Sequence, residues 1–423
     1  MRVLISGAGI AGPTLAWFLA RTGARITIIE RSRSVPSGGH NVDVNHGAID
    51  VMRKMGLIDQ LRRFNTTEKG TRLIGPSGQP FAPFPVKAGS SASPTSEFEI
   101  LRGDLAAVLH EATEDHPNIE YLFGTTCSKI ISDDEGSDSA RVELSDGRIR
   151  EFDLVVAADG QWSKIRAQVF PRDSVALVDK NMYVVYATIP RLPGDDDWWN
   201  VYQAIGSRII TLRPDPHGTI RAMLSRVPRG AAQKRAWREA AGAGRAQQQE
   251  LARREFKDAG WQAARVLDAM EQKGPAGDYY FQETKQVRMD RWSRGRVVCL
   301  GDAAFAPTQL TGMGTSLAII GGYVLAGELG GLATGEHPAR AVEAYERALR
   351  PYVEETQKIP RVFPRIAHPA TAGERWLFGA CVSGLSKIVA MPWVAQRFFN
   401  DTNVDDSEFP LPVYPNLADE SLK

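Results

Sequence analysis

The sequence contains little cysteine and almost no net charge. Its three cysteines, Cys127, Cys299 and Cys381, form no CxxC pair and have no cluster of histidines beside them. This pattern argues against a disulfide framework and a zinc site, and it fits a reducing, cytoplasmic compartment. The formal net charge is +1, so the composition does not indicate binding to nucleic acid or to an acidic membrane surface.

Long apolar runs are also missing. A transmembrane helix needs about 18 uninterrupted apolar residues, and the sequence has no such run. The first residues could be mistaken for a signal peptide, but Gly7, Gly9, Gly12 and Pro13 interrupt the apolar stretch. With 423 residues, 43% of them hydrophobic, the chain can bury a large core, so we expect one compact, two-lobed unit.

The N-terminal residues have the order of a dinucleotide-binding βαβ unit. A short apolar strand over residues 3–6 runs into a glycine turn and a helical stretch over 13–21, and a second strand over 25–30 ends in an acidic residue. A GxGxxG match alone is weak evidence, but here the whole context is present. The alternative is an ordinary glycine turn.

The residues of this turn have distinct expected roles. Gly7 makes the tight turn, Gly9 lets a pyrophosphate approach the backbone, and Gly12 lets the helix pack closely on the strand. Glu30 is expected to accept hydrogen bonds from an adenosine ribose, and its charge disfavours a 2′-phosphate there. Arg31 follows in a loop that lies either near the phosphates or in a solvated turn.

A second motif stands near residue 300. An apolar run over residues 297–300 leads to Gly301 and Asp302, and Gly312-Met-Gly314 then precedes a helical stretch that begins near Thr315. A carboxylate, close-approach glycines and a helix N-terminus suit a cofactor that has hydroxyls and an electron-accepting ring. The alternative is a buried strand followed by a capped turn.

Two further segments carry candidate polar residues. An apolar strand over residues 152–159 ends in Asp159-Gly160, and Arg166 follows on a short helix, where it binds a phosphate or pairs with a nearby carboxylate. Arg102 precedes a helix that Asp104 can cap, and the alternative for this arginine is a surface ion pair.

The middle of the chain changes character. Residues 180–290 contain strand-like segments separated by turns, with a helical stretch over 231–270, and they predict a second, antiparallel sheet. The apolar stretch over 373–399 is expected to form a helix that packs across the body. A membrane-surface or oligomer role is its alternative.

In their order, the three motifs resemble the class A flavoprotein monooxygenases, which have the para-hydroxybenzoate hydroxylase-like fold. The resemblance spans roughly residues 1–360, and the LRGDL and GDAA…GMGTSLA segments look most like the tetracycline-inactivating and fungal secondary-metabolite branches. It implies an α/β fold: a Rossmann-like FAD-binding domain (1–175 and 291–360), an inserted antiparallel-sheet substrate domain (176–290) and a C-terminal helical segment (361–423).

The resemblance also implies roles for the motif residues. Noncovalent FAD would be held at its ADP part by the N-terminal turn, and Arg102 would contact its linking region. Asp302 would hold the ribityl or pyrophosphate part, and Gly314 and Thr315 would lie at the ring. Asp159 and Gly160 would serve FAD and, transiently, NADPH, whose phosphate is assigned to Arg166.

The activity implied is reduction of FAD by NADPH, reaction with O₂ at flavin C4a, and oxygen transfer to a small organic substrate, with no metal. Tyr186, Arg208 and Arg213, on the expected antiparallel sheet, are candidates for the substrate pocket, where an arginine could stabilise a phenolate or enolate. The alternative for each is an ordinary sheet residue.

Two other functions stay open: a reductase or dehydrogenase, and a non-catalytic binding protein of the same fold. The substrate, the choice between NADPH and NADH, and the oligomeric state stay open.

Overall fold

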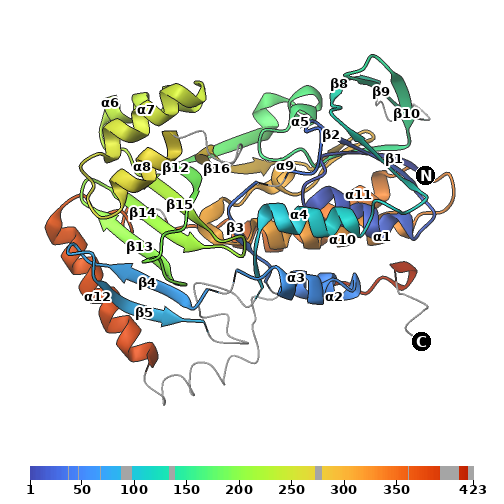
Figure 1. The fold of residues 1–423 in the computed structure, drawn as a ribbon. Helices are drawn as coiled ribbons and strands as arrows, with labels where there is room; N and C mark the ends of the chain where they lie inside the picture. Colours follow the sequence, from blue (N-terminus) through green and yellow to red (C-terminus); the bar gives the residue numbers. More distant parts are fainter. Residues whose placement is uncertain are drawn as a thin grey trace.

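The structure is a computed structural model. It describes residues 1–36, 38–45, 47–66, 68–86, 98–132, 139–271, 279–360, 362–390 and 409–417. Within these residues, a largely parallel sheet and a larger, mostly antiparallel sheet form two neighbouring lobes (Figure 1). This is the mixed α/β architecture that the motifs predict.

The first lobe is built on a six-stranded sheet in the order β17-β18-β11-β1-β2-β7. Its strands are β1 (Arg2–Ser6), β2 (Arg25–Glu30), β7 (Ile119–Phe123), β11 (Leu154–Ala157), β17 (Ser293–Arg294) and β18 (Val297–Cys299). All neighbours pair in parallel except β17 with β18. Most residues of β1, β2, β11 and β18 are buried, which suits a sheet covered on both faces. Because these four strands run parallel, their carboxyl ends lie at one edge of the sheet.

Helices surround this sheet (Figure 1). They are α1 (Ala11–Ala20), α2 (Gly47–Lys54), α3 (Ile58–Arg63), α4 (Arg102–Glu111), α5 (Lys164–Val169), α9 (Asp302–Phe305), α10 (Gly314–Gly330) and α11 (Ala339–Thr356). α1 and α10 approach closely at Gly322, where an added Cβ would lie 3.0 Å from the Leu15 nitrogen. An added Cβ on Gly330, at the end of α10, would lie 2.9 Å from Thr22, which follows α1, so the N-termini of both helices lie on the same side of the lobe.

Two small sheets and three 3₁₀ turns complete the lobe. One sheet joins β8 (Cys127–Ser132), β9 (Ala140–Leu144) and β10 (Ile149–Phe152), and the other joins β3 (Asn41–Asp43) to β6 (Glu99–Leu101). The turns are η1 (Arg172–Ser174), η2 (Gln309–Thr311) and η3 (Pro415–Leu417).

The second lobe is a seven-stranded sheet in the order β16-β12-β15-β14-β13-β4-β5. Its strands are β4 (Gly70–Ile74), β5 (Pro80–Pro85), β12 (Val175–Pro190), β13 (Trp199–Ala204), β14 (Arg208–Pro214), β15 (Thr219–Arg226) and β16 (Tyr280–Met289). β4 pairs in parallel with β13, so a hairpin from the expected first domain extends this sheet. From the sequence, residues 71–85 are expected to form either a hairpin or an irregular loop; the structure shows the hairpin, and its pairing with β13 was not predicted.

One face of the larger sheet is covered by α6 (Ala231–Ala241), α7 (Arg245–Phe256) and α8 (Ala263–Glu271). Tyr183, Val185, Ile210 and Leu224 from the sheet form one hydrophobic cluster with residues of these helices, including Trp237. Because side chains alternate along a strand, the neighbouring residues point to the opposite face. That face is turned toward the first lobe.

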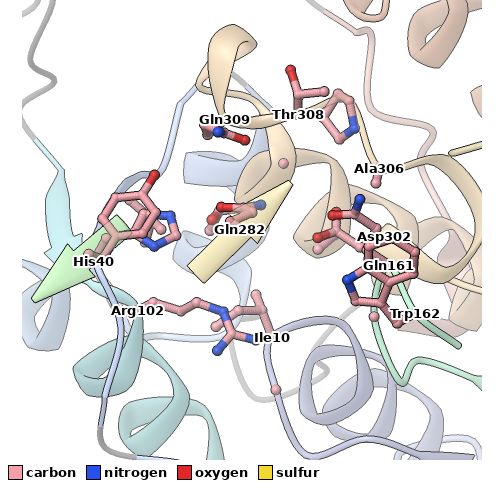
Figure 2. A pocket seen from close by; sticks show the side chains of 18 of the residues that line it. Ile10, His40, Arg102, Gln161, Trp162, Gln282, Asp302, Ala306, Thr308 and Gln309 are labelled. Atoms are coloured by element: carbon pink, nitrogen blue, oxygen red, sulfur yellow. The ribbon is translucent and has the colours of Figure 1, made fainter. Parts of the chain in front are cut away.

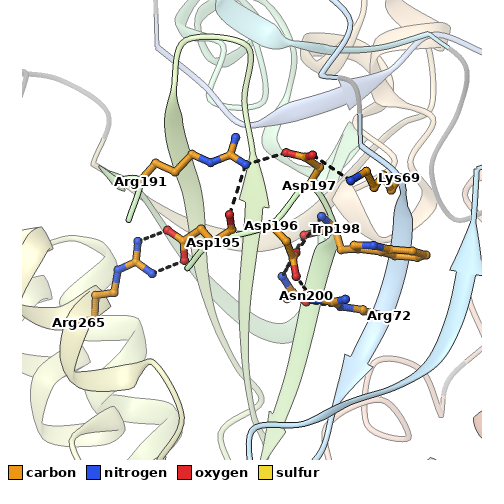
Figure 3. Close-up of polar contacts among 9 residues, drawn as sticks. All are labelled: Lys69, Arg72, Arg191, Asp195, Asp196, Asp197, Trp198, Asn200 and Arg265. Atoms are coloured by element: carbon orange, nitrogen blue, oxygen red, sulfur yellow. Dashed lines mark hydrogen bonds and ion pairs between the residues drawn. The ribbon is translucent and has the colours of Figure 1, made fainter. Parts of the chain in front are cut away.

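The loop between β12 and β13 is fixed by ion pairs (Figure 3). Asp195 pairs with Arg265 of α8 at 2.6 Å, Asp196 pairs with Arg72 of β4, and Asp197 pairs with Arg191 at 2.6 Å. Asp195 and Asp196 therefore tie the loop to α8 and β4, whereas Asp197 pairs with an arginine of the loop itself.

The C-terminal helix α12 (Ala372–Ala390) lies beside β5, and Ser386 donates a hydrogen bond of 2.7 Å to the Pro83 carbonyl. Its other side leaves Trp376 73% exposed. Residues 391–399 of the expected C-terminal helix lie outside the described residues. In the part of the chain that is described, none of the helices combines the length and the apolar character needed to cross a membrane.

Candidate functional site

A cavity of about 990 Å³ lies between the two lobes. Its walls come from the carboxyl edge of the six-stranded sheet, the uncovered face of the seven-stranded sheet, the segment 306–315 and the segment 363–368. This volume is at the upper end of the range for ligand sites, about 300–1,000 Å³. A cavity at the carboxyl ends of parallel strands is where open α/β sheets bind ligands.

The N-terminal glycine turn has the close contacts that its sequence predicts. Gly7 has a φ of +118°, and a Cβ there would lie 2.3 Å from the Ala158 carbonyl oxygen. A Cβ on Gly12 would lie 2.1 Å from the Gly7 oxygen. Gly7 and Gly9 line the cavity, whereas Gly12 lies outside its lining and allows α1 to sit close to the turn.

Glu30 stands at the end of β2 and lines the cavity with Arg31. Its carboxylate accepts hydrogen bonds from the backbone nitrogens of Ala8 at 3.0 Å and Ser32 at 2.9 Å. These bonds hold the carboxylate beside the glycine turn, in the position expected for a ribose-binding acid.

Arg102 and Asp302 point into the same space from opposite sides (Figure 2). A Cβ on Gly9 would come within 3.4 Å of the Arg102 guanidinium, so this arginine lies directly against the turn. Burial raises the pKa of the Asp302 carboxyl, and the charge of Arg102 acts in the opposite direction. Asp302 lines the cavity, where its carboxylate can accept hydrogen bonds from a bound ligand.

The N-terminus of α10 also borders the cavity. Gly314 and Thr315 line it, and a Cβ on Gly314 would lie 3.8 Å from the Asp302 carboxylate. The helix N-terminus favours negative charge on a ligand at that end, and the neighbouring carboxylate can accept hydrogen bonds from the ligand's hydroxyls.

The Asp159-Gly160 motif lines the cavity from the end of β11. One oxygen of Asp159 accepts a hydrogen bond of 2.9 Å from the Lys164 nitrogen, and the other oxygen is buried with no partner. A buried acceptor without a partner costs free energy unless a ligand donates to it. Gly160 has a φ of +83°, so the turn needs a glycine.

The structure places Arg166 away from the cavity. Its guanidinium is buried and donates hydrogen bonds of 2.7 Å to the carbonyls of Ala303 and Gln161. The sequence-based placement of Arg166 at an NADPH phosphate is therefore corrected, because Nη1 and Nη2 of its guanidinium both donate to backbone carbonyls. The alternative role for Arg166 was an ion pair with a nearby carboxylate, and its hydrogen-bond partners are instead these two carbonyls.

The candidates on the antiparallel sheet separate by strand face. Tyr186 and Arg213 line the cavity, and the Tyr186 ring stacks on His40 with centroids 4.5 Å apart. Arg208 lies on the other face, where it pairs with Asp258 at 2.6 Å and donates to the Glu255 carbonyl at 2.7 Å. The expectation that Arg208 lines the pocket is corrected, because Ile209, its neighbour in the strand, occupies the cavity face.

Several cavity residues were not singled out from the sequence. His40 stacks on Tyr186, and its burial, followed by the charges of Arg102 and Arg213, lowers its pKa to about 4. Gln282 of β16 has a buried side-chain oxygen with no partner (Figure 2). Ser225 and His368 also line the cavity and contact each other. No local motif marks these positions, because the segments meet only in the folded chain.

Among the described residues, no group of three or more histidine, cysteine or acidic side chains is placed to hold a metal ion.

Comparison with known proteins gives consistent matches. A family model described as an FAD binding domain matches residues 1–358. The flavin-dependent monooxygenase eupH of Phoma sp is 36% identical over 370 residues, which cover 84% of each protein. The monooxygenase CTB7 of Cercospora beticola is 34% identical over 416 residues and 95% of each protein.

Solved structures are similar over most of the chain. The tetracycline destructase Tet(51) aligns with a TM-score of 0.73 at 27% identity, over 92% of this chain and 98% of that one. A complex of Klebsiella pneumoniae HpxO with FAD and uric acid aligns with a TM-score of 0.66 at 19% identity, over 91% and 93% of the two chains, and it supports the fold alone.

Proposed function

Because the chain belongs to the class A FAD-dependent monooxygenase family, we propose that it uses NADPH or NADH and O₂ to insert one oxygen atom into a small organic molecule. The chain is a flavoprotein oxidoreductase by this membership. The proposal adds three things to this membership: the electron donor, the class of substrate, and the residues that bind the cofactor and the substrate.

The residues of the cavity fit FAD. The observation that carries the proposal is the meeting, in one cavity, of the Gly7 turn, the Glu30 carboxylate and Asp302 beside the N-terminus of α10. We propose that the turn and Glu30 hold the ADP part, that Arg102 contacts the linking region, and that Asp302 accepts hydrogen bonds from the cofactor's hydroxyls. The unpartnered oxygen of Asp159 supports a further ligand donor at that wall.

Bound FAD supplies the redox chemistry and the activation of O₂. The protein's residues then have three tasks: they position the substrate, keep water out and stabilise charge. The uncovered face of the seven-stranded sheet, with Tyr186 and Ile209, faces the Asp302 wall across the cavity and is the proposed substrate side.

Two other activities compete with this proposal. A flavin-dependent reductase would use the same FAD site and add two hydrogens to its substrate. A non-catalytic binding protein would need neither Glu30 nor Asp302 in the cavity. The matched relatives named as monooxygenases support oxygen insertion, and aromatic or polyketide-like compounds are the proposed substrates.

The decisive experiment measures NADPH and NADH oxidation by the purified, FAD-loaded protein with a panel of aromatic and polyketide compounds. Oxygen uptake and a product heavier by one oxygen atom are expected. A product heavier by two hydrogens supports the reductase.

The Asp302→Ala variant should bind FAD roughly 10- to 100-fold more weakly, because it loses a charged hydrogen-bond acceptor. A protein that stays colourless after incubation with FAD contradicts the whole proposal.

A further inference from the structure

The uncovered face of the seven-stranded sheet contributes two cations to the cavity lining, Arg213 and Arg221. The other lysines and arginines among the described lining residues are Arg31, Arg102 and Lys164, which stand on the dinucleotide side at the ends of first-lobe elements. The charge that a substrate meets on the sheet therefore depends on how these two arginines are paired.

Arg213 is held by buried carboxylates. Its guanidinium donates to both oxygens of Glu68, at 2.7 and 3.0 Å, and forms an ion pair with Glu99. Both glutamate side chains are at most 2% exposed. Burial raises the pKa of each carboxyl, and Arg213 opposes that rise. When one or both glutamates are ionised, the group formed by Arg213, Glu68 and Glu99 has no net positive charge.

Arg221 is paired as well. Its Nε donates to Asp215 at 2.9 Å, and its Nη1 donates to the Thr188 hydroxyl at 2.6 Å. The Asp215 side chain is fully buried. An anionic group placed against this sheet would thus meet arginines whose charge is already offset, and at Arg213 it would also meet two nearby carboxyls. Such an arrangement selects against anions.

A different polar pair faces the same cavity. His368 Nδ1 lies 2.9 Å from the Pro364 carbonyl, which can only accept, so Nδ1 carries the hydrogen. His368 Nε2 must then accept the hydrogen bond of 2.8 Å that joins it to the Ser225 hydroxyl. Ser225 donates its only hydrogen to His368, and the lone pairs of its oxygen remain as acceptors.

Both members of this pair are buried and lie among apolar neighbours. Ser225 is 1% exposed and His368 is 3% exposed, yet both line the cavity. Ile209 stands opposite Ser225 in the neighbouring strand, and Met223 lies two positions before Ser225 on the same strand face. Burial lowers the pKa of His368 to about 4, so at neutral pH the imidazole is uncharged and stays an acceptor.

We infer that Ser225, oriented by His368, is a specificity-determining acceptor for a neutral substrate that donates a hydroxyl or N–H hydrogen, and that the sheet rejects anionic substrates. This inference rests on the proposed function, because it takes the cavity to be the substrate site. Ser225 contacts the substrate directly, and His368 is a positioning residue that fixes the direction of the serine hydroxyl.

The test uses the FAD-loaded protein and three matched probes: naphthol, its methyl ether and naphthoate. Calorimetric titration should show tighter binding of naphthol than of the ether, by up to about tenfold, since the ether cannot donate to Ser225. Naphthoate should bind more weakly than naphthol. Ser225→Ala should remove the preference for naphthol over the ether.

Ser207→Ala is the matched control. Ser207 is also buried next to this sheet, but it does not line the cavity, so the preference should persist in the variant. His368→Gln retains an acceptor for Ser225 and should keep the preference, whereas His368→Leu should lose it. The double variant Glu68→Gln, Glu99→Gln leaves Arg213 uncompensated and should strengthen naphthoate binding.

Equal binding of naphthol and ether by the unmodified protein would overturn the inference. So would an unchanged preference in Ser225→Ala, tighter binding of naphthoate, or failure of naphthol to bind. FAD content and oxygen insertion are scored separately. A protein that carries FAD and oxygenates the carboxylate contradicts this inference and leaves the proposed function intact, whereas absence of FAD contradicts the proposed function.

Discussion

Arg166 joins two backbone segments that carry cavity residues. Its guanidinium donates to Gln161, which follows the Asp159-Gly160 turn, and to Ala303, which follows Asp302. The arginine thus fixes two motifs relative to each other without lining the cavity. Burial lowers the pKa of its guanidinium, although two nearby acidic groups oppose this shift.

The Arg166→Ala variant should therefore lose stability and FAD together. Two buried carbonyls would lose their donors, and an unsatisfied buried group costs about 1–3 kcal/mol. Urea unfolding and FAD titration should show a lower free energy of unfolding and weaker FAD binding. With FAD saturating, the KM for NADPH or NADH should be unchanged. A raised KM with normal stability and FAD affinity would restore the phosphate-binding role. Arg166→Lys is the control that retains the charge.

At the scale of the strand, alternation decides which side chains reach the cavity. β14 places Ile209, Thr211 and Arg213 on the cavity face, and it places Arg208 on the face covered by α7 and its neighbours. Arg208 and Arg213 were both expected on the antiparallel sheet and both lie on this strand, but they are five positions apart and fall on opposite faces. A sequence pattern with mixed polar and apolar residues does not show which face will be the cavity.

The loop between β12 and β13 gives an element-scale prediction. Arg265 donates to both oxygens of Asp195, at 2.7 and 2.6 Å, and both side chains are at most 16% exposed. Arg191 and Asp197 form a pair that is 30% and 40% exposed. Arg265→Ala should therefore cost about 1–3 kcal/mol of stability, because a mostly buried carboxylate loses its arginine and keeps the Leu192 backbone nitrogen as a donor. Denaturant unfolding measures this loss.

Arg191→Ala is the matched control from the same loop. The exposed pair should contribute less than about 1 kcal/mol, because water and salt screen it. Equal losses in the two variants would mean that burial does not set the strength of these ion pairs. A neutral Arg265→Ala would mean that the loop is held by its backbone contacts.

At the scale of the whole molecule, buried histidines make stability depend on pH. Burial lowers the pKa of His368 to about 4 from an ordinary value near 6.5. Between these values the unfolded chain binds the proton and the folded protein does not, so the free energy of unfolding falls as the pH falls. From pH 7 to pH 5 this one group should cost about 2 kcal/mol.

The measurement compares the unmodified protein with His368→Gln in urea at both pH values. The variant should lose less stability on acidification, by about 2 kcal/mol. The comparison is needed because Glu68, Glu99 and Asp302 have raised pKa values and act in the opposite direction: their folded forms bind protons more readily than the unfolded chain. An identical pH response in both proteins would contradict the assignment to His368.

The sequence by itself determined the parts of this protein that depend on neighbouring residues. The strands of the βαβ unit, the turns at Gly7 and Gly160, and the acid at the end of β2 follow from local periodicity and backbone requirements. The sequence also placed Glu30, Asp159 and Asp302 each at the end of a strand, and because parallel strands end at one edge, all three line one cavity in the folded chain.

Only the tertiary structure decided the other wall. β4 and β5 join a sheet whose next strand lies more than a hundred residues away, and His368 reaches Ser225 across 143 positions of sequence. The roles of Arg166, Arg208 and Arg213 depended on which carbonyls and carboxylates lay within reach. Such partners are set by packing between distant segments, which local periodicity does not encode. Hence the cofactor side could be inferred from motifs, whereas the proposed substrate side required the folded chain.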